Sequence, residues 1–390
     1  MRQKINLLRQ YESMRHAILR KMRFLNRGTV DFALIFILLA ALTMVSTLFS
    51  AEDTYLTGQV VETKRYTDEA GLLWENTRFE VKNGPLKGQH SSREPIEGQS
   101  ALFPQLKPGD KVVLIAMEGP DGIEVHVVEP KRSGAVAAVL LLFSVLLVLL
   151  GRRKGVCALL SLAVTGWMIV YLFVPAVARG ENPLAWAVVI CAASTIVTIL
   201  LVAGWTAKSA AAILGTIGGI IISAVVSLFF GYWMKLTGTA DEAVYYLVFS
   251  RVGGLNFLGI LHAGIIIGSL GAVMDVAMSL SSAAYELRKQ HGKTSSGKIF
   301  RSLMNIGRDI TGTMANTLVL AYAGGSLALF LLIYLQPDMI FVKLWNMEFI
   351  AAEVLRAAAG SIGILAAVPT TALSAALIIG HSSGLSHKFV

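Results

Sequence analysis

The chain has few charged residues. Asp, Glu, Lys and Arg make up 15% of its 390 residues, whereas hydrophobic residues make up 55%, and the mean hydropathy is +0.64. Soluble domains carry about 25% charged residues. The composition therefore excludes an ordinary soluble protein and indicates an integral membrane protein.

Cysteines and catalytic motifs are also scarce. The two cysteines, Cys157 and Cys191, lie in apolar segments, so no disulfide framework is expected. No zinc signature, Ser-His-Asp arrangement or catalytic cysteine motif stands out. Residues 292–295 resemble the end of a phosphate-binding loop, but residues 284–290 lack the earlier glycine that the motif requires. We therefore expect no enzyme activity, no cofactor and no bound metal.

Long apolar segments are abundant. Crossing the hydrocarbon core of a bilayer takes about 20 residues. Eight segments qualify: residues 31–50, 134–151, 155–176, 183–204, 209–233, 255–278, 310–335 and 357–380. The sequence thus predicts an α-helical integral membrane bundle of about eight transmembrane helices. The first segment is longer than the core of a cleavable signal peptide, about 7 to 15 residues, so we expect an uncleaved anchor.

Basic residues gather at one predicted face of the membrane. Eight of them lie in residues 1–30, six in the connection 286–309 and three in the turn 152–154. An even number of helices between these clusters puts all three on one side, which the positive-inside rule assigns to the cytoplasm. Both ends of the chain, residues 1–30 and the tail 381–390, are then cytoplasmic. Orientation explains the net charge of +9, so no nucleic-acid partner is expected.

A polar stretch, residues 51–133, separates the first two predicted helices and should face outward. Strand-like runs at residues 58–63, 77–81, 111–115 and 122–128 alternate with turn-forming sequences. They predict a small extracytoplasmic all-β domain, a barrel or sandwich of OB-like type. His90 and His126 are single histidines, and we expect structural or surface roles for them. The expected role of the domain is binding, gating or docking.

Asp275 lies in the middle of the sixth predicted helix. At about 100° per residue, Asp275 shares one stripe with residues Gly264, Gly268, Gly271, Ser279, Ser282 and Glu286. An ionisable side chain inside an apolar helix is a functional candidate by default, here for proton or ion coupling. The alternative is a neutral or paired structural acid. His262, on another side of the helix, is expected to be a packed neutral histidine.

The seventh predicted helix begins with a polar face that carries Asp309, Thr313, Asn316 and Thr317. Adjacent antiparallel helices pack side by side, so we expect hydrogen bonds from this face to Asp275 and Ser279. The ordinary explanation is that the hydroxyl and amide groups join the helices and that Gly264, Gly268 and Gly271 allow close helix packing. The coupling hypothesis and this packing role remain alternatives.

Glu353 and Arg356 stand three residues apart on a predicted amphipathic helix, residues 346–359, just outside the last membrane segment. A local ion pair is the simplest interpretation. The sharper alternative is a gating role, which they would share with Asp309.

Three strings carry a resemblance to a known family: residues 271–279, 307–318 and 360–369. They resemble the YibE/F family of bacterial multi-pass membrane proteins, and the resemblance covers most of the chain. It implies a location in the bacterial inner (cytoplasmic) membrane. It implies no established substrate.

A more distant similarity concerns the order of features. A glycine-rich helix with an aspartate, then a basic connection, then a threonine-rich helix is similar to resistance-nodulation-division permeases and SecDF translocation factors. Asp275 matches the aspartate, and Thr313 and Thr317 match the threonine face. Eight helices exceed one repeat of those folds, which implies an extra hairpin, and a single repeat implies a partner or a second copy.

The leading hypothesis is a secondary transporter or proton-coupled translocation factor in which Asp275 is the coupling carboxylate. Its substrate, a small molecule or a peptide, is not identified by the sequence. The alternative is a non-transporting scaffold or regulatory protein whose outer β domain binds a partner. Expected partners are the lipid bilayer and either a homo-oligomer or another membrane protein.

Overall fold

The computed structural model describes residues 55–68, 73–83, 86–95, 106–119, 122–240, 244, 247, 254–291, 295–335 and 341–381. The described chain divides into two compact units between Arg152 and Arg153. The predicted N-terminal segment 1–30, the predicted first helix 31–50 and residues 382–390 of the tail lie outside the described residues.

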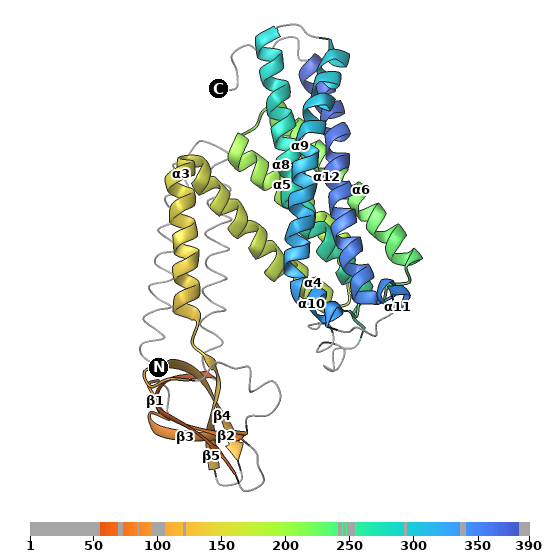
Figure 1. Ribbon diagram of the computed structural model, residues 1–390. Coiled ribbons are helices and arrows are strands. Elements are labelled where there is room, and N and C mark those ends of the chain that lie inside the picture. The colour runs from red at the N-terminus through yellow and green to blue at the C-terminus, as the bar shows by residue number, and fades with distance from the viewer. Residues whose placement is uncertain are drawn as a thin grey trace. The chain divides into compact units, whose positions relative to one another are not determined.

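The first unit contains a five-stranded antiparallel sheet in the order β3-β2-β1-β4-β5 (Figure 1). Its strands are β1 (Tyr55–Thr67), β2 (Leu73–Val81), β3 (Gly88–Pro95), β4 (Lys111–Gly119) and β5 (Gly122–Pro130). The central strand β1 pairs on both sides, because Gly58 faces Val81 of β2 and Val112 of β4. Alternate residues such as Val60, Phe79 and Leu114 form the core. The predicted small β unit ahead of the helices is confirmed.

Strand β3 was not predicted. Its sequence, GQHSSREP, has none of the β-branched or aromatic residues that favour strands. The strand forms because it pairs with β2 along its whole length, from Val81 opposite Gly88 to Trp74 opposite Pro95. Pairing with a neighbour, rather than local preference, decides its conformation.

Helix α3 (Ser133–Met168) continues through the π-helical turn η3 (Ile169–Phe173) into α4 (Val174–Ala178). Together they make 46 residues, too many for one crossing of about 20 residues. The backbone is broken at Arg152, where φ is 48° and ψ is −127°, values that no helical residue adopts. The break falls between the predicted segments 134–151 and 155–176.

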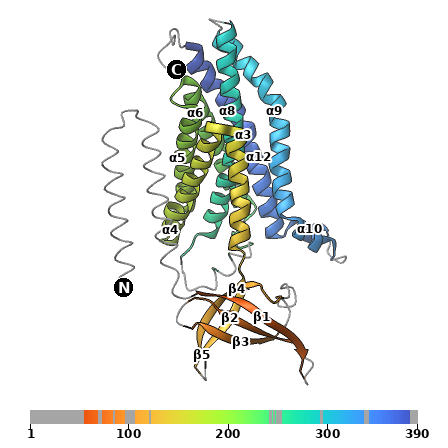
Figure 2. The same cartoon turned by 90° about the vertical axis from the view of Figure 1, so that its left-hand side faces the viewer.

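The long helices of the second unit lie side by side (Figures 1 and 2): α5 (Pro183–Ala203), α6 (Ala207–Trp233), α8 (Phe257–His291), α9 (Ser296–Gly325) and α12 (Glu348–His381). The short helices α10 (Leu327–Tyr334) and α11 (Phe341–Trp345) lie at one end of them (Figure 1). In the described chain, five helices are long and apolar enough to cross a membrane, or six if α9 and α10, bent by 61°, form one broken span. The multi-pass helical character is confirmed, while the count of eight stays a prediction.

Two helices are longer than their predicted membrane segments. α8 runs to His291 rather than ending at residue 278, and α9 begins at Ser296 rather than at residue 310. The predicted connection 286–309 is therefore mostly helical. The extension is stabilised by packing of Ile299 and Leu303 against residues such as Ala284 and Ala375. A hydropathy pattern marks the apolar core of a helix, not its ends.

Glycines allow the closest approach within the second unit. A Cβ built on Gly219 of α6 would lie 2.8 Å from the Gly363 carbonyl oxygen of α12 and 2.8 Å from Val273 Cγ1 of α8. No side chain fits there. Small residues at such contacts let helix backbones approach each other, so α6, α8 and α12 form a tightly packed core.

Candidate functional site

Asp275 lies at mid-height in the helix bundle. Val273, two residues before it, packs against Gly219, which is close to the middle of α6 (Ala207–Trp233). A helix rises about 1.5 Å per residue, so Asp275 lies within a few ångströms of that level. The depth is the one that the sequence predicts.

The direction of the Asp275 side chain differs from the expectation. The residues of α8 that face α6 and α12 are fully buried, including Val273, Ala277 and Leu280. The predicted stripe lies on the other side of the helix, where Gly264, Gly268, Gly271, Asp275, Ser279 and Glu286 are exposed and Ser282 is half-buried. We call this side of α8, from Gly264 to Ser279, the open face.

The three glycines of the stripe do not behave alike. A Cβ on Gly268 would lie 2.6 Å from Tyr322 Oη of α9, whereas a Cβ on Gly264 or Gly271 would meet nothing within 4 Å among the described residues. Only Gly268 is at a close helix contact in this structure. Space remains beside the other two.

The expected bonds between α8 and α9 are not formed. Thr313 Oγ1 donates to the Ile310 carbonyl at 2.9 Å, and Thr317 Oγ1 donates to the Thr313 carbonyl at 2.9 Å, both within α9. Within the described part of the chain, Asp275 and Asn316 have no hydrogen bond or ion pair. The predicted coupling residues of α8 and α9 are therefore exposed, but no hydrogen bond among the described residues joins one helix to the other through them.

Helix geometry explains why Thr313 does not reach α8. Tyr322 marks the side of α9 that contacts α8, because it touches Gly268. Thr313 precedes Tyr322 by nine residues, about 180° around the helix, and Asn316 lies about 120° away. Thr313 therefore points away from α8.

Arg308 is a residue that the sequence analysis missed as a candidate. It precedes Tyr322 by fourteen residues, so it is about 40° from it around α9, on the side toward α8. It is exposed, and its Nη1 donates to Asn305 Oδ1 at 3.2 Å. The apolar run of the seventh segment begins after Arg308, so the sequence placed this residue in a connection. No sequence signal could have placed it on the side toward α8, because only the structure shows that Tyr322 contacts α8.

Arg308 lies nearer than Asp275 to the end of the bundle that carries Lys298. Along α9 it is fourteen residues from Tyr322, about 21 Å, whereas along α8 Asp275 is seven residues, about 10 Å, from Gly268, which Tyr322 contacts. Its neighbour Gly307 packs against Val368 of α12. Asp275 and Arg308 therefore lie at different levels. No ion pair joins them in the part of the chain that the structure describes.

The predicted ion pair of α12 is confirmed. Arg356 Nη1 and Glu353 Oε1 are 3.0 Å apart, with side chains 29% and 27% exposed. Glu353 also accepts a hydrogen bond from Ser326 Oγ at 3.2 Å, at the break between α9 and α10. The pair belongs to one long helix, Glu348–His381, and not to a separate helix outside the membrane. Glu353 therefore contacts a bend in the neighbouring span.

His262 is a packed residue, as expected. It is 2% exposed, and its Nδ1 is 2.7 Å from Ser227 Oγ of α6. Gly231 leaves the space that the imidazole ring fills. The ring joins α8 to α6 on the closed side of the helix.

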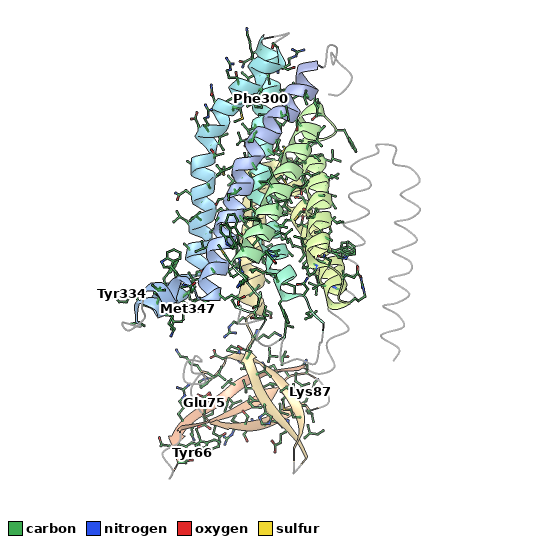
Figure 3. The ribbon with its side chains drawn as sticks, turned by 90° about the vertical axis from the view of Figure 1, so that its right-hand side faces the viewer. Tyr66, Glu75, Lys87, Phe300, Tyr334 and Met347 are labelled. Carbon is green, nitrogen blue, oxygen red and sulfur yellow. The ribbon has the colours of Figure 1, made fainter. Side chains whose placement is uncertain are left out.

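Aromatic and acidic residues meet at the end of the bundle near α4 and α5. Trp186 Nε1 donates to Glu181 Oε2 at 2.7 Å, and Arg179 Nε donates to Glu181 Oε1 at 3.0 Å. The hydrogen bond from Trp186, followed by that from Arg179, lowers the pKa of the Glu181 carboxyl. Tyr334 and Met347 also lie toward this end, and Phe300 lies at the opposite one (Figure 3). Tryptophan and tyrosine are typical of a membrane interface.

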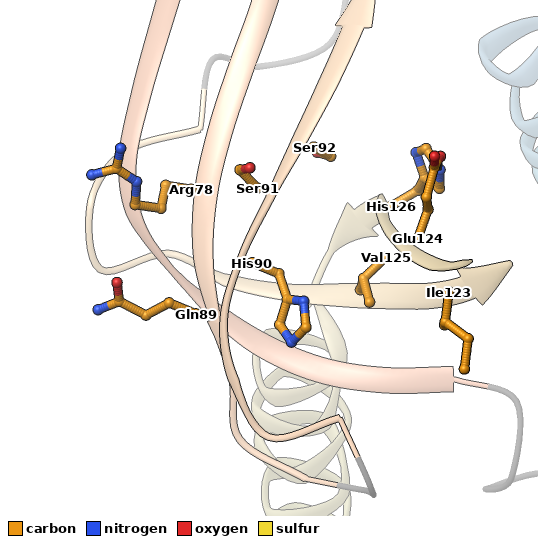
Figure 4. Close-up of a pocket in the computed structure, with 9 residues that line it drawn as sticks. All are labelled: Arg78, Gln89, His90, Ser91, Ser92, Ile123, Glu124, Val125 and His126. Carbon is orange, nitrogen blue, oxygen red and sulfur yellow. Dashed lines mark ion pairs between the residues drawn. The ribbon is translucent and has the colours of Figure 1, made fainter. Parts of the chain in front are cut away.

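The β unit carries an open polar cleft of about 650 Å³ between β3 and β5 (Figure 4). It is lined by Arg78, Gln89, His90, Ser91, Ser92, Ile123, Glu124, Val125 and His126. His90 Nε2 is 2.9 Å from the Leu86 carbonyl oxygen, and His126 Nε2 is 3.3 Å from Glu124 Oε2. Both histidines thus have local structural contacts. Among the described residues, no group of His, Cys, Asp and Glu side chains is suited to hold a metal ion.

These features define a class, a multi-pass helical membrane protein with a carboxylate at mid-height in its bundle. A family model described as YibE/F-like protein matches residues 139–381, well over half of the chain. The chain therefore belongs to the YibE/F-like family. No similar protein was found among curated proteins or among solved structures.

Proposed function

We propose that this protein is a secondary transporter or proton-coupled translocation factor of the bacterial cell membrane. In this proposal, Asp275 takes up and releases the coupling proton. The observation that carries it is a carboxylate at mid-height on the open face, with no hydrogen-bond or ion-pair partner among the described residues. Membership of a membrane-protein family is consistent with this setting.

Binding of a proton to a carboxylate at this depth changes the free energy of the helix in the membrane by a large amount. A carboxylate at the centre of a membrane helix costs about 2.5–3.5 kcal/mol on insertion scales. Protonation removes the charge and that cost. Two arrangements of α8 and α9 that expose Asp275 differently would therefore change in population as the proton binds and leaves.

The surroundings of α8 favour such a movement. The space beside Gly264 and Gly271 leaves room for α8 to shift against a neighbour. Helix α9 ends in a bend of 61°, and Glu353 holds Ser326 at that bend. We assign the gating role to Glu353 and Arg356, near the bend, and to Asp309 of α9.

The proposed orientation places the end of the bundle with Lys208, Lys298 and Arg301 in the cytoplasm, together with both chain termini. The Trp186 end and the β domain then face outward. The concentration of basic residues at one end supports this orientation. In a background without Cys157 and Cys191, Lys298→Cys and Glu181→Cys are treated with a membrane-impermeant thiol reagent on intact cells, and only Glu181→Cys is expected to react.

The test of coupling is proton flux in vesicles. The full chain is reconstituted in liposomes with a pH-sensitive dye inside, and a potassium diffusion potential is imposed. Asp275→Asn is expected to reduce proton entry to the level of empty vesicles while the protein keeps its unfolding temperature. Glu286→Gln, a neutralised acid on the same side of α8 near the cytoplasmic end, is the matched control and should retain flux. Wild-type flux in Asp275→Asn would reject the assignment.

The second candidate is a non-transporting scaffold or regulatory protein, which the polar cleft of the β domain favours. Under this alternative, wild-type vesicles carry no more protons than empty ones. Deleting residues 52–132 would then remove all function in cells, and Asp275→Asn would act only through stability.

A further inference from the structure

A second polar cluster lies beside the bend between α9 and α10. Ser326 Oγ donates to Glu353 Oε2 at 3.2 Å, and Arg356 Nη1 is 3.0 Å from Glu353 Oε1. Tyr322, one turn before Ser326 on α9, interacts electrostatically with both Arg356 and Glu353. We call Tyr322, Ser326, Glu353 and Arg356 the bend cluster, because α9 meets α10 at Ser326.

Two polar atoms of the bend cluster are buried without a partner. Among the described residues, Tyr322 Oη and Arg356 Nε have no hydrogen bond. A buried polar group that lacks a hydrogen bond costs about 1–3 kcal/mol, and in folded proteins such groups usually bond to ordered water. Arg356 Nε can only donate, whereas Tyr322 Oη can both donate and accept, so water can bond to each of them. The bend cluster is therefore suited to hold water inside the bundle.

The bend cluster extends from the proposed outward end of the bundle toward Asp275. Glu353 is five residues, about 8 Å, from Glu348, the first residue of α12. Gly360 lies seven residues deeper than Glu353 on the same helix, and a Cβ on it would be 3.9 Å from Tyr322 Cε2. Tyr322 is therefore the member of the cluster that lies deepest in the bundle.

Tyr322 also lies on the stripe of α8 that carries Asp275. A Cβ on Gly268 would be 2.6 Å from Tyr322 Oη. Asp275 follows Gly268 by seven residues, which is about 10 Å along α8 and about 20° around it. Between the two, a Cβ on Gly271 would meet nothing within 4 Å among the described residues. At about 2.8 Å for each O–H···O bond, about three waters in a row span this distance.

We infer that the bend cluster is the outer half of the path by which a proton reaches Asp275, with Tyr322 as a positioning residue that holds water at its inner end. The inference rests on the proposed function and deepens it. Each water in the row passes one proton on as it receives another, and the last water donates to the Asp275 carboxylate, which becomes a carboxylic acid. No other bond changes. The charges of Glu353 and Arg356 compensate each other, so the path has no net charge that would repel the proton.

Tyr322→Phe tests the path with little structural change. The hydroxyl that it removes has no partner among the described residues and the aromatic ring is kept, so the unfolding temperature should not fall. In the vesicle assay of proton flux, this variant is expected to be slower at least about tenfold. Tyr334→Phe, the same change at an exposed tyrosine of α10, is the matched control and should keep wild-type flux.

Thiol labelling tests for water at the inner end of the path without a flux measurement. In the background without Cys157 and Cys191, Tyr322→Cys should react with a small membrane-impermeant methanethiosulfonate from the side on which Glu181→Cys reacts. The reactive form of cysteine is the thiolate, which requires water. Leu320→Cys is the matched control. Leu320 is exposed, about 3 Å from the level of Tyr322 and about 160° from it around α9, and its cysteine variant should not react.

The outcomes separate this inference from the proposed function. If Asp275→Asn loses flux and Tyr322→Phe keeps it, the proton reaches Asp275 by another route and this inference alone is overturned. Wild-type flux in Asp275→Asn, or wild-type vesicles without flux, would reject the proposed function and this inference with it. Failure of Tyr322→Cys to react, or equal reaction of Leu320→Cys, would show that no water path enters the bundle at the bend.

Discussion

The two sides of helix α8 differ in almost every respect. On the closed side, Val273, Ala277 and Leu280 are fully buried between neighbouring helices, and His262 contacts Ser227. On the open face, Asp275 and Ser279 are exposed. Helical periodicity of about 100° per residue allows one segment to carry both.

The difference indicates how stability and function are divided in this bundle. Polar groups on the closed side are small or have a partner across the helix contact, so burial costs little. On the open face, by contrast, Asp275 is an ionisable carboxyl group whose charge only another protein surface or water can accommodate. Packing holds α8 in place from one side and leaves the other side available.

The largest expected effect comes from matched glycine substitutions on the two sides. Gly219→Ala would bring a Cβ within 2.8 Å of the Gly363 carbonyl oxygen, so it should lower the free energy of unfolding by about 1–3 kcal/mol. Gly264→Ala meets nothing within 4 Å among the described residues and should leave stability unchanged or slightly higher, because alanine favours a helix. The free energy of unfolding of both variants is measured in detergent. Equal losses would contradict the division between the two sides.

An intermediate effect is expected from the polar residues of α8. His262→Ala removes a buried ring and leaves the Ser227 hydroxyl without its partner, which should cost about 2 kcal/mol without changing proton flux. Asp275→Asn should do the reverse, with little loss of stability and loss of flux. Stability and vesicle flux measured on the same preparations would sharpen the comparison. A histidine variant that is stable but without flux would place function on the closed side instead.

The smallest effect is expected at Ser279. Its side chain is exposed on the open face, so Ser279→Ala should change the free energy of unfolding by less than about 0.5 kcal/mol. Ser269, fully buried on α8 near Gly360 of α12, provides the contrast, since Ser269→Val should be destabilising by overpacking. A large loss at Ser279 would show that the open face is packed within a single copy.

Much of the fold followed from local patterns. Apolar runs located every described long helix, because the hydrocarbon core sets a length that the sequence must meet. Alternation and turn sequences located four of the five strands. Strand β3 could not be found this way, because its conformation comes from pairing with β2. The ends of α8 and α9 were also missed, since their outer turns are held by contacts such as Ile299 with Ala284.

The candidate site was predicted only in part. The depth of Asp275 and the stripe that it shares with three glycines were read from spacing alone. The residues that neighbour Asp275 were not predicted correctly, because a helix pattern shows which residues share a side of the helix but not which side meets which other helix. Thr313 was expected beside Asp275 and points away, whereas Arg308 was assigned to a connection and lies on the side toward α8.

The sequence by itself determined that this chain is a multi-pass helical membrane protein with a small β unit and a carboxylate at mid-height. These properties depend on hydrophobicity and spacing along the chain. Only the tertiary structure decided that Asp275 lies on the exposed side of α8 and that Thr313 points away from α8. Rotation and depth of one helix against another depend on side-chain contacts between residues far apart in the sequence, such as Gly219 with Val273 and Gly307 with Val368.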